Sequence, residues 1–294
     1  MSDKKTLVVS IIIPTRNAES NLEACLASIR SQSHKNMEIV ITDNYSNDRT
    51  VEIAKKYDTN VIICGPRPPH NNFFTAPIQR KLGAMHASGD FYFFVDADMI
   101  LDQELLKDCV MKCLSGADAV AIPEISFGDG FWSKCKIAER ACYFTPSVDD
   151  EVIQAARFFK SITYELVGGW NESVGGFDDW NITLRIRKKG FKISLSNYLI
   201  LHNEGYLTLR KLVLKKYNMG KCSSVLKYMS SSKSIKAIAI QLTPLRLIMI
   251  LKRLSKIRKN SHRILFGIMF MKTIEGSAFI MGRIVNAIEL KVKA

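Results

Sequence analysis

Short apolar segments alternate with helical segments from the start of this chain, and this alternation limits the possible folds more than any other feature. Residues 7–13 (LVVSIII) form a run of mostly β-branched apolar side chains, typical of a strand that is covered on both faces. Residues 21–31 carry apolar side chains at helical spacing, and residues 37–42 (MEIVIT) predict a second strand. Strands that alternate with helices in this way indicate a doubly wound, mostly parallel α/β sheet.

The alternation continues to residue 195. We expect further helices over residues 50–57, 76–88, 103–114, 132–143, 162–167 and 178–189. We expect further strands over residues 60–64, 91–95, 119–125, 156–160 and 191–195. Two polar segments, residues 65–75 and 144–155, are expected to be loops.

The net charge divides the chain into two parts. The whole chain carries +14, but residues 204–294 hold 19 basic and 3 acidic side chains, so residues 1–203 sum to −2. We therefore predict two domains, an α/β domain over residues 1–203 and a basic helical region over residues 204–294. Because the α/β part has no excess of positive charge, a uniformly basic nucleic-acid-binding protein is not expected, and we predict no nucleic-acid partner.

Cysteine usage and apolar segments give expectations about location. The seven cysteines form no C-x-x-C pair, which favours reduced thiols in the cytoplasm and no zinc site. The N-terminal segment lacks the features of a signal peptide. No run of 18 uncharged apolar residues occurs, so no conventional membrane span is expected.

Two carboxylates, Asp96 and Asp98, follow the apolar strand expected at residues 91–95. In open α/β sheets, ligands bind beyond the carboxyl ends of the strands, and residues two apart in an extended chain face the same side. Two such carboxylates repel each other unless a cation lies between them, and a hard divalent cation that also binds phosphate oxygens fits this position. An ordinary acidic turn is the alternative. Further polar clusters follow the first two strands, at residues 14–17 (PTRN) and 43–44 (DN), where ordinary turn chemistry is again the alternative.

Four segments, in this order, resemble a family 2 glycosyltransferase with the GT-A fold: VSIIIPTRN, IVITDNYSNDRT, QRKLGAMHASGDFYFFVDADM and GGFDDWNITLRIRKKG. The resemblance covers residues 7–202, roughly two-thirds of the chain. It implies the doubly wound, mostly parallel α/β sheet of nucleotide-diphospho-sugar transferases. It also implies an inverting transfer from a nucleotide-sugar donor, a UDP-sugar by default, with Mg or Mn on the diphosphate.

The resemblance assigns roles to individual residues. It implies that the nucleotide is bound by Pro14, Thr15, Arg16, Asn17 and Asp43. Arg80 and Lys81 match the segment beside the diphosphate, where positive charge is suitable. The DxD motif is Asp96, Ala97 and Asp98, with Asp98 as the direct metal ligand and Asp96 nearer the ribose. His202 matches a histidine near the metal, so the implied metal set is Asp96, Asp98 and His202.

Asp178 and Asp179 match the acidic pair of the family, and Asp179 is therefore the expected general base. At the start of a helix, the helix dipole keeps a carboxylate ionised and able to accept a proton. Capping of the helix is the alternative role for both residues, and the two roles are compatible. The nearby aromatic residues Trp170 and Phe177 either contact the acceptor sugar or belong to the core. A QxxRW motif is absent, which favours non-processive addition of one sugar per encounter.

The basic region over residues 204–294 has two interpretations. In residues 264–290, a helix with 100° per residue places the charged side chains within an arc of about 120° and leaves the rest apolar. Such helices either close the α/β core or lie on an anionic membrane with their basic side chains at the headgroups. The segment KKYNMGK resembles segments of glycosyltransferases that act on lipid-linked acceptors, and we favour the membrane.

Together these features predict a metal-dependent, inverting glycosyltransferase, peripheral on the inner, cytoplasmic face of the cell membrane. Its acceptor is expected to be a polyprenyl-phosphate-linked or other cell-surface glycan. One alternative is a nucleotidyltransferase, although the glycine-rich loop of that class is absent. The other is a non-enzymatic nucleic-acid-binding protein that uses the basic region, and the intact base candidate Asp179 argues against it.

Overall fold

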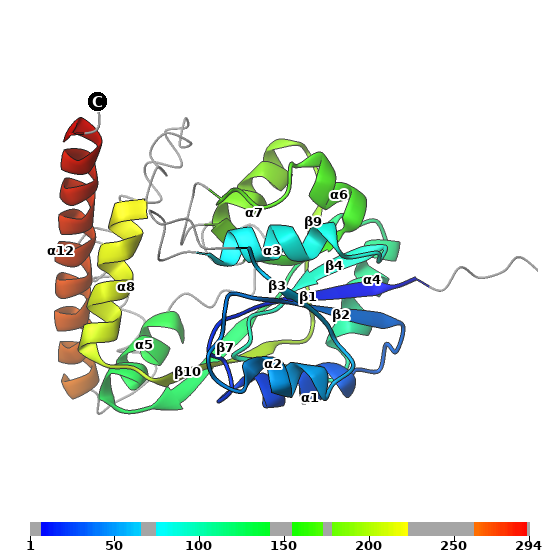
Figure 1. Cartoon of the computed structure of the whole chain (residues 1–294), viewed down its shortest axis with the longest axis horizontal. Coiled ribbons are helices and arrows are strands. Elements are labelled where there is room, and N and C mark those ends of the chain that lie inside the picture. Colours follow the sequence, from blue (N-terminus) through cyan, green and yellow to red (C-terminus); the bar gives the residue numbers. More distant parts are fainter. Residues whose placement is uncertain (1–6, 66–74, 142–154, 173–177, 223–261, 293–294) are drawn as a thin grey trace, which may run out of the picture. The chain divides into compact units, whose positions relative to one another are not determined.

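A computed structural model describes residues 7–65, 75–141, 155–172, 178–222 and 262–292 (Figure 1). The expected loops lie almost wholly outside these residues, as does Phe177. The chain forms two compact units. The first comprises Met1–Glu124, Thr145–Glu172 and Asp178–Asn203, and the second comprises Ile125–Phe144, Ser173–Phe177 and Glu204–Ala294.

The first unit is built on a seven-stranded sheet in the order β3-β2-β1-β4-β8-β6-β9. Its strands are β1 (Val9–Thr15), β2 (Met37–Asp43), β3 (Asn60–Ile63), β4 (Phe91–Phe94), β6 (Ala119–Ala121), β8 (Ala156–Lys160) and β9 (Ile193–Leu195). Strands β1 to β4 are parallel, and β9 is parallel to β6. Only β8 runs antiparallel to its neighbours in this sheet, β4 and β6. The predicted mostly parallel α/β sheet is therefore confirmed.

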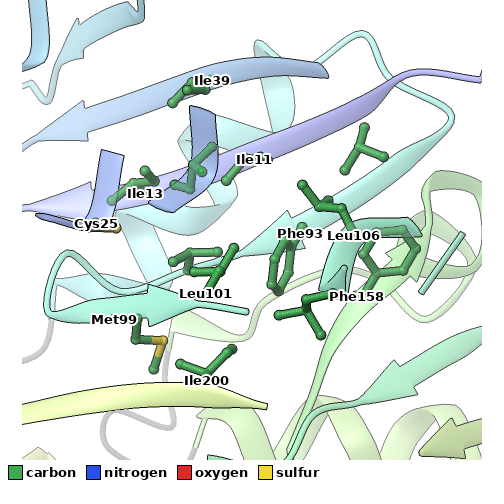
Figure 2. Packing of buried hydrophobic residues seen from close by; sticks show 14 of the residues in the cluster. Ile11, Ile13, Cys25, Ile39, Phe93, Met99, Leu101, Leu106, Phe158 and Ile200 are labelled. Carbon is green, nitrogen blue, oxygen red and sulfur yellow. The ribbon is translucent and has the colours of Figure 1, made fainter. Parts of the chain in front are cut away.

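Helices cover both faces of this sheet: α1 (Leu22–Arg30), α2 (Thr50–Lys55), α3 (Ala76–Met85), α4 (Leu105–Leu114), α6 (Ser161–Leu166) and α7 (Asp178–Lys188). Successive side chains of a strand point to opposite faces, so Ile11 and Ile13 join one core and Ile12 joins the other. Figure 2 shows Ile11 and Ile13 of β1 in the same core as Phe93 of β4. These residues are fully buried, so the sheet is a rigid base for the loops at its carboxyl edge.

Two short strands were not predicted. Strand β5 (Met99–Leu101) directly follows Asp98 and pairs antiparallel with β10 (Ile200–Tyr206), which places His202 opposite Met99. The prediction of one strand over residues 119–125 was wrong. That segment divides into β6 and β7 (Glu124–Asp129). Pro123 lies between them, and proline cannot donate a ladder hydrogen bond.

Within the described residues, the helices of the second unit are α5 (Phe131–Ala141), α8 (Leu209–Cys222) and α12 (His262–Val292). Glycines let α8 and α12 approach closely. A Cβ atom at Gly220 would lie 2.2 Å from the carbonyl oxygen of Phe279, and one at Gly282 would lie 2.1 Å from that of Tyr217. The two helix backbones are therefore in contact at these glycines.

Ion pairs join α5 to α12 inside the second unit. Lys136 lies 2.8 Å from Glu139 and 3.6 Å from Glu275. Lys272 lies 2.8 Å from Glu139 and 2.9 Å from Glu275. Both glutamates are buried, so each depends on the two lysines for its charge compensation.

By length and composition alone, the stretch His262–Glu289 of α12 is long and apolar enough to cross a membrane. The expectation of no conventional membrane span considered only uninterrupted apolar runs, and it stays a prediction. Lys272 and Glu275 interrupt this one.

Candidate active site

Asp96 lies just beyond the carboxyl end of β4, and two buried arginines hold it. Arg80 of α3 donates from Nη2 to Asp96 Oδ1 at 2.6 Å, and Nη1 of Arg157, on β8, lies 3.4 Å from Asp96 Oδ2. Burial by itself would raise the pKa of Asp96, but the charges of the two arginines outweigh it and hold this pKa well below its usual range. Asp96 is therefore an anion with both oxygens paired.

The predicted acidic pair begins α7, and the same two arginines contact it. Arg80 Nη1 donates to Asp178 Oδ2 and also lies 3.3 Å from Asp179 Oδ1. Arg157 Nη2 lies 3.5 Å from Asp179 Oδ2. Asp96 of the predicted DxD motif and the candidate base Asp179 thus belong to one ion-pair cluster.

Asp178 is the more buried member of the pair. Burial raises its pKa to about 6, even though Arg80 and the helix backbone favour the charged form. The neighbouring carboxylates Asp179 and Asp96 raise it further.

The ring of Trp170 packs against the guanidinium group of Arg80. The guanidinium carbon of Arg80 lies 4.8 Å from the centroid of the Trp170 ring, a cation–π contact. The ring also packs edge-on against Phe94 and is only 2% exposed. Of the two roles considered for Trp170, the structure therefore supports the core, and no acceptor can reach the ring without rearrangement.

His202 lies on β10 between two carboxylates. Its Nε2 atom lies 3.4 Å from Asp98 Oδ2, and its Nδ1 atom lies 3.3 Å from Glu124 Oε2. Burial alone would lower the pKa of His202, but the hydrogen bonds to Asp98 and Glu124 raise it to about 9.

The residues around Asp98 fit a divalent cation. Asp98 Oδ1 is buried and has no hydrogen-bond partner, and a bound cation would satisfy such an atom. His202 is close enough to contribute Nε2, whereas the oxygens of Asp96 are already paired with arginines. Within the described part of the chain, no group of three or more His, Cys, Asp or Glu residues could hold a metal ion. Donor phosphates and water would have to complete the coordination, which is common for Mg²⁺ sites.

The polar ends of β1 and β2 lie side by side. Asp43 is buried, and its Oδ1 atom accepts hydrogen bonds from Thr15 Oγ1 at 2.8 Å and Ser46 Oγ at 2.6 Å. Gln79 Nε2 donates to the carbonyl oxygens of Thr15 at 2.9 Å and Thr42 at 2.6 Å. These bonds fix the sheet edge at which the nucleotide is expected.

The other predicted residues divide between exposed and half-buried positions. Arg16 and Asn17 are exposed at the end of β1, while Pro14 and Ala97 are half-buried. Lys81 does not join the cluster, because its Nζ atom lies 2.8 Å from Glu172 on the surface.

The sequence did not identify two members of the cluster, Arg157 and Glu124. Arg157 Nε donates to Glu124 Oε1 at 2.6 Å. The available signal was a charged side chain, Arg157, ahead of the apolar Phe158 and Phe159 in the strand ARFFK.

Comparison with known proteins shows the family to which the chain belongs. The profile of "Glycosyl transferase family 2" matches residues 10–170, more than half of the chain. The chain belongs to this family. It is a family 2 glycosyltransferase with a GT-A fold.

Three relatives illustrate the similarity. A 4,4'-diaponeurosporenoate glycosyltransferase of Staphylococcus haemolyticus is 33% identical over 107 residues, 36% of this chain and 28% of the relative. The poly(ribitol-phosphate) beta-N-acetylglucosaminyltransferase TarP of Staphylococcus aureus is 31% identical over 156 residues, 48% of this chain and 47% of the relative. A dolichol-phosphate mannosyltransferase of Pyrococcus furiosus is 34% identical over 115 residues, 37% of this chain and 31% of the relative. The match spans less than half of each relative.

Two solved structures have the same fold. The mannosyltransferase PcManGT of Pyrobaculum calidifontis, in complex with GDP-Man and Mn2+, has a TM-score of 0.59 at 17% identity, covering 95% of this chain and 86% of that one. TarS 1-349 of S. aureus has a TM-score of 0.52 at 15% identity, covering 94% of this chain and 90% of that one. At these identities the likeness shows the fold alone.

Proposed function

We propose that this glycosyltransferase is a metal-dependent, inverting, non-processive enzyme. It moves a sugar from a nucleoside-diphosphate donor to a lipid-linked or cell-surface glycan acceptor. The strongest support is the position of Asp179, which shares Arg80 with Asp96 of the DxD motif and so lies beside the expected donor site.

Asp179 is the general base in this proposal. It lies in the first turn of α7 and faces Arg80 and Arg157. The acceptor hydroxyl transfers its proton to the Asp179 carboxylate while its oxygen forms the new glycosidic bond. The bond between the sugar and the diphosphate breaks, and its electron pair leaves with the nucleoside diphosphate.

Charge develops on the departing diphosphate. A bound Mg²⁺ or Mn²⁺ ion would supply positive charge to stabilise it, held by Asp98 with His202 nearby. Thr15 and Asp43 shape the nucleoside end of the site, with Arg16 and Asn17 exposed beside them. The two structural neighbours are described with different donors, PcManGT with GDP-Man and TarS 1-349 with UDP-GlcNAc. We take a UDP-sugar as the default donor of this chain.

The relatives support the proposed acceptor class. Their names include a dolichol-phosphate mannosyltransferase and an enzyme of poly(ribitol-phosphate) modification. A polyprenyl-phosphate-linked or cell-surface glycan is the corresponding acceptor for this chain.

We also propose that the second unit binds the cytoplasmic face of the membrane, in a peripheral manner. One face of α12 is exposed and apolar, and it consists of Phe266, Met269, Phe270, Ile280, Met281, Ile284 and Ile288. At 100° per residue these side chains fall within an arc of about 120°. The hydroxyls of Thr273 and Ser277 lie in the same arc and bond to backbone carbonyls one turn earlier, at 3.0 and 3.1 Å.

The charged side of α12 faces the other way. Lys272 and Glu275 are directed into the ion pairs with α5, so the charges are inside the unit and the apolar side chains are outside. A helix on the surface of a water-soluble protein has its charged side chains outside and its apolar side chains inside. The reverse arrangement in α12 suits contact with lipid. The +16 charge of residues 204–294 suits anionic headgroups.

The proposed chemistry is tested with two variants and a matched control. Asp179→Asn should abolish transfer and leave donor binding unchanged, because the amide cannot accept the proton. Asp98→Ala should weaken metal-dependent donor binding in a thermal-shift screen of nucleotide sugars with Mg²⁺ or Mn²⁺. Glu52→Gln is the control, since Glu52 also lies in the first turn of a helix but on the surface of α2. Unchanged turnover by Asp179→Asn would refute the assignment of the base.

Flotation with liposomes tests the membrane proposal. The full chain should float with anionic vesicles, and replacing Phe266, Ile280 and Ile284 by serine should reduce flotation. Replacing the exposed Ile63 of β3 by serine is the control. Full activity in solution without any binding to anionic vesicles would contradict membrane association.

A further inference from the structure

Arg157 is one of the two buried arginines in the charged cluster of the first unit. It is only 5% exposed. Its three nitrogens approach three carboxylates that come from different parts of the chain. Nε donates to Glu124 at 2.6 Å, Nη1 lies 3.4 Å from Asp96 and Nη2 lies 3.5 Å from Asp179.

The strand that carries Arg157 fixes its position. Strand β8 is inserted between β4 and β6, and its residue Phe158 pairs with Phe93 of β4. This register brings Arg157 to the end of β4, where Asp96 follows. Phe158 and Phe159 are fully buried, so the strand has little freedom to shift.

Charge compensation also depends on Arg157. Arg80 contacts Asp96, Asp178 and Asp179. Its single positive charge cannot neutralise three carboxylates. Without Arg157, the second oxygen of Asp179 would lose the cation beside it, and Asp179 would be repelled by Asp96. The planar guanidinium suits three separate acceptors, whereas the ammonium of a lysine acts as a point charge.

Glu124 connects Arg157 to the opposite side of the site. Its Oε1 atom accepts the hydrogen bond from Arg157, and its Oε2 atom lies 3.3 Å from Nδ1 of His202. The same carboxylate therefore orients both Arg157 and His202, and the Nε2 atom of His202 faces Asp98.

We propose that Arg157 and Glu124 are a pair of positioning residues. Arg157 holds the carboxylate of Asp179 in place beside Asp96, and Glu124 holds Arg157 and His202. This inference rests on the proposed role of Asp179 as the general base. Its consequence is that Arg157 affects the chemical step much more than it affects donor binding.

The test compares Arg157→Lys with the wild type and with Arg49→Lys, a control on an exposed arginine that pairs with Glu19. For each protein, kcat, the donor KM, the donor dissociation constant and the unfolding temperature are measured. For Arg157→Lys we expect kcat to fall by about tenfold to a hundredfold, because a misplacement of about 1 Å is enough for such a loss. The donor dissociation constant should change by less than about threefold, because Arg157 positions the carboxylate of Asp179 and does not itself bind the donor.

A second variant tests the coupling. Glu124→Gln keeps an acceptor for Arg157 but removes the charge, and it should lower kcat in the same direction. If the residues act as a pair, the double variant should be no slower than the slower single variant.

Three results would overturn the pairing. The first is an unchanged kcat in Arg157→Lys, and the second is a loss of donor affinity equal to the loss of kcat. The third is a loss of kcat that follows only the unfolded fraction. If Asp179→Asn abolishes transfer while Arg157→Lys keeps full kcat, the pairing fails and the proposed function stands. Full turnover by Asp179→Asn overturns both.

Discussion

The contact between α8 and α12 predicts that Gly282→Ala destabilises the second unit although alanine favours helix. The new Cβ atom would lie 2.1 Å from the carbonyl oxygen of Tyr217, 3.0 Å from the carbonyl carbon of Tyr217 and 3.0 Å from the amide nitrogen of Lys221. All three are backbone atoms, so no side-chain rotation can relieve the overlap. The helices must move apart.

The size of this effect follows from the geometry. Ordinary contact for a Cβ atom begins at 3.4 Å, so the substitution is short by about 1.3 Å. Overpacking of this kind typically costs about 1–3 kcal/mol. Gly276→Ala is the matched control on the same helix, because a Cβ atom there meets nothing within 4 Å. Both alanines gain up to about 1 kcal/mol of helix propensity, so Gly282→Ala should be less stable than Gly276→Ala by about 1–3 kcal/mol.

Hydrogen exchange measured on peptides from α8 and α12 is the suitable assay, because it reports the opening of these helices separately from the rest of the chain. We expect faster exchange in Gly282→Ala and equal or slower exchange in Gly276→Ala, both relative to the wild type. Equal protection in the two variants would refute the idea that the helix backbones touch at Gly282.

Three further predictions concern stability. Burial lowers the pKa of Lys216 to about 7; the unfolded chain then binds more protons between pH 7 and the ordinary lysine pKa of about 10.4, so stability should rise with pH over that window. The urea midpoint of the wild type should rise with pH over this window, and that of Lys216→Met should rise less. The same pH dependence in both proteins would contradict the prediction. Gly83→Ala places a Cβ atom 2.4 Å from Cγ2 of Ile12 and should lower the free energy of unfolding by about 1–3 kcal/mol, unlike Gly65→Ala, where nothing lies within 4 Å. Thermal unfolding of the two variants measures the difference. Glu139→Gln leaves two half-buried lysines with one carboxylate fewer and should cost about 3 kcal/mol in thermal unfolding; wild-type stability would show that the ion pairs contribute nothing.

The order of strands and helices could be predicted because it depends on local patterns. A buried apolar run such as β1 specifies a strand by itself. The direction of β8 could not be predicted, since a strand of five residues has the same composition in either direction. Strands β5 and β10 were missed because one has only three residues and the other, ILHNEGY, is largely polar.

The candidate site was predictable where it follows an element boundary. Asp96 follows β4 and Asp179 lies in the first turn of α7, so motif and pattern both indicated them. Arg80 and Lys81 were expected together, but neighbours on a helix point about 100° apart, and only Arg80 faces the cluster. Arg157 was missed because its three partners are distant in sequence and pairing across the fold leaves no local pattern.

The short ladder between β5 and β10 has a consequence for how this enzyme can vary. Asp98 directly precedes β5, and His202 pairs with Met99 across the ladder, so three residue pairs set the position of both side chains. Side chains alternate along a strand, and inserting one residue into the ladder would turn His202 to the opposite face. Insertions between residues 102 and 199 leave this register unchanged. Loops within that segment can therefore lengthen without moving Asp98 or His202, provided that Glu124, Arg157 and Asp179, which lie in the same segment, keep their ion pairs, while the ladder tolerates no change in length.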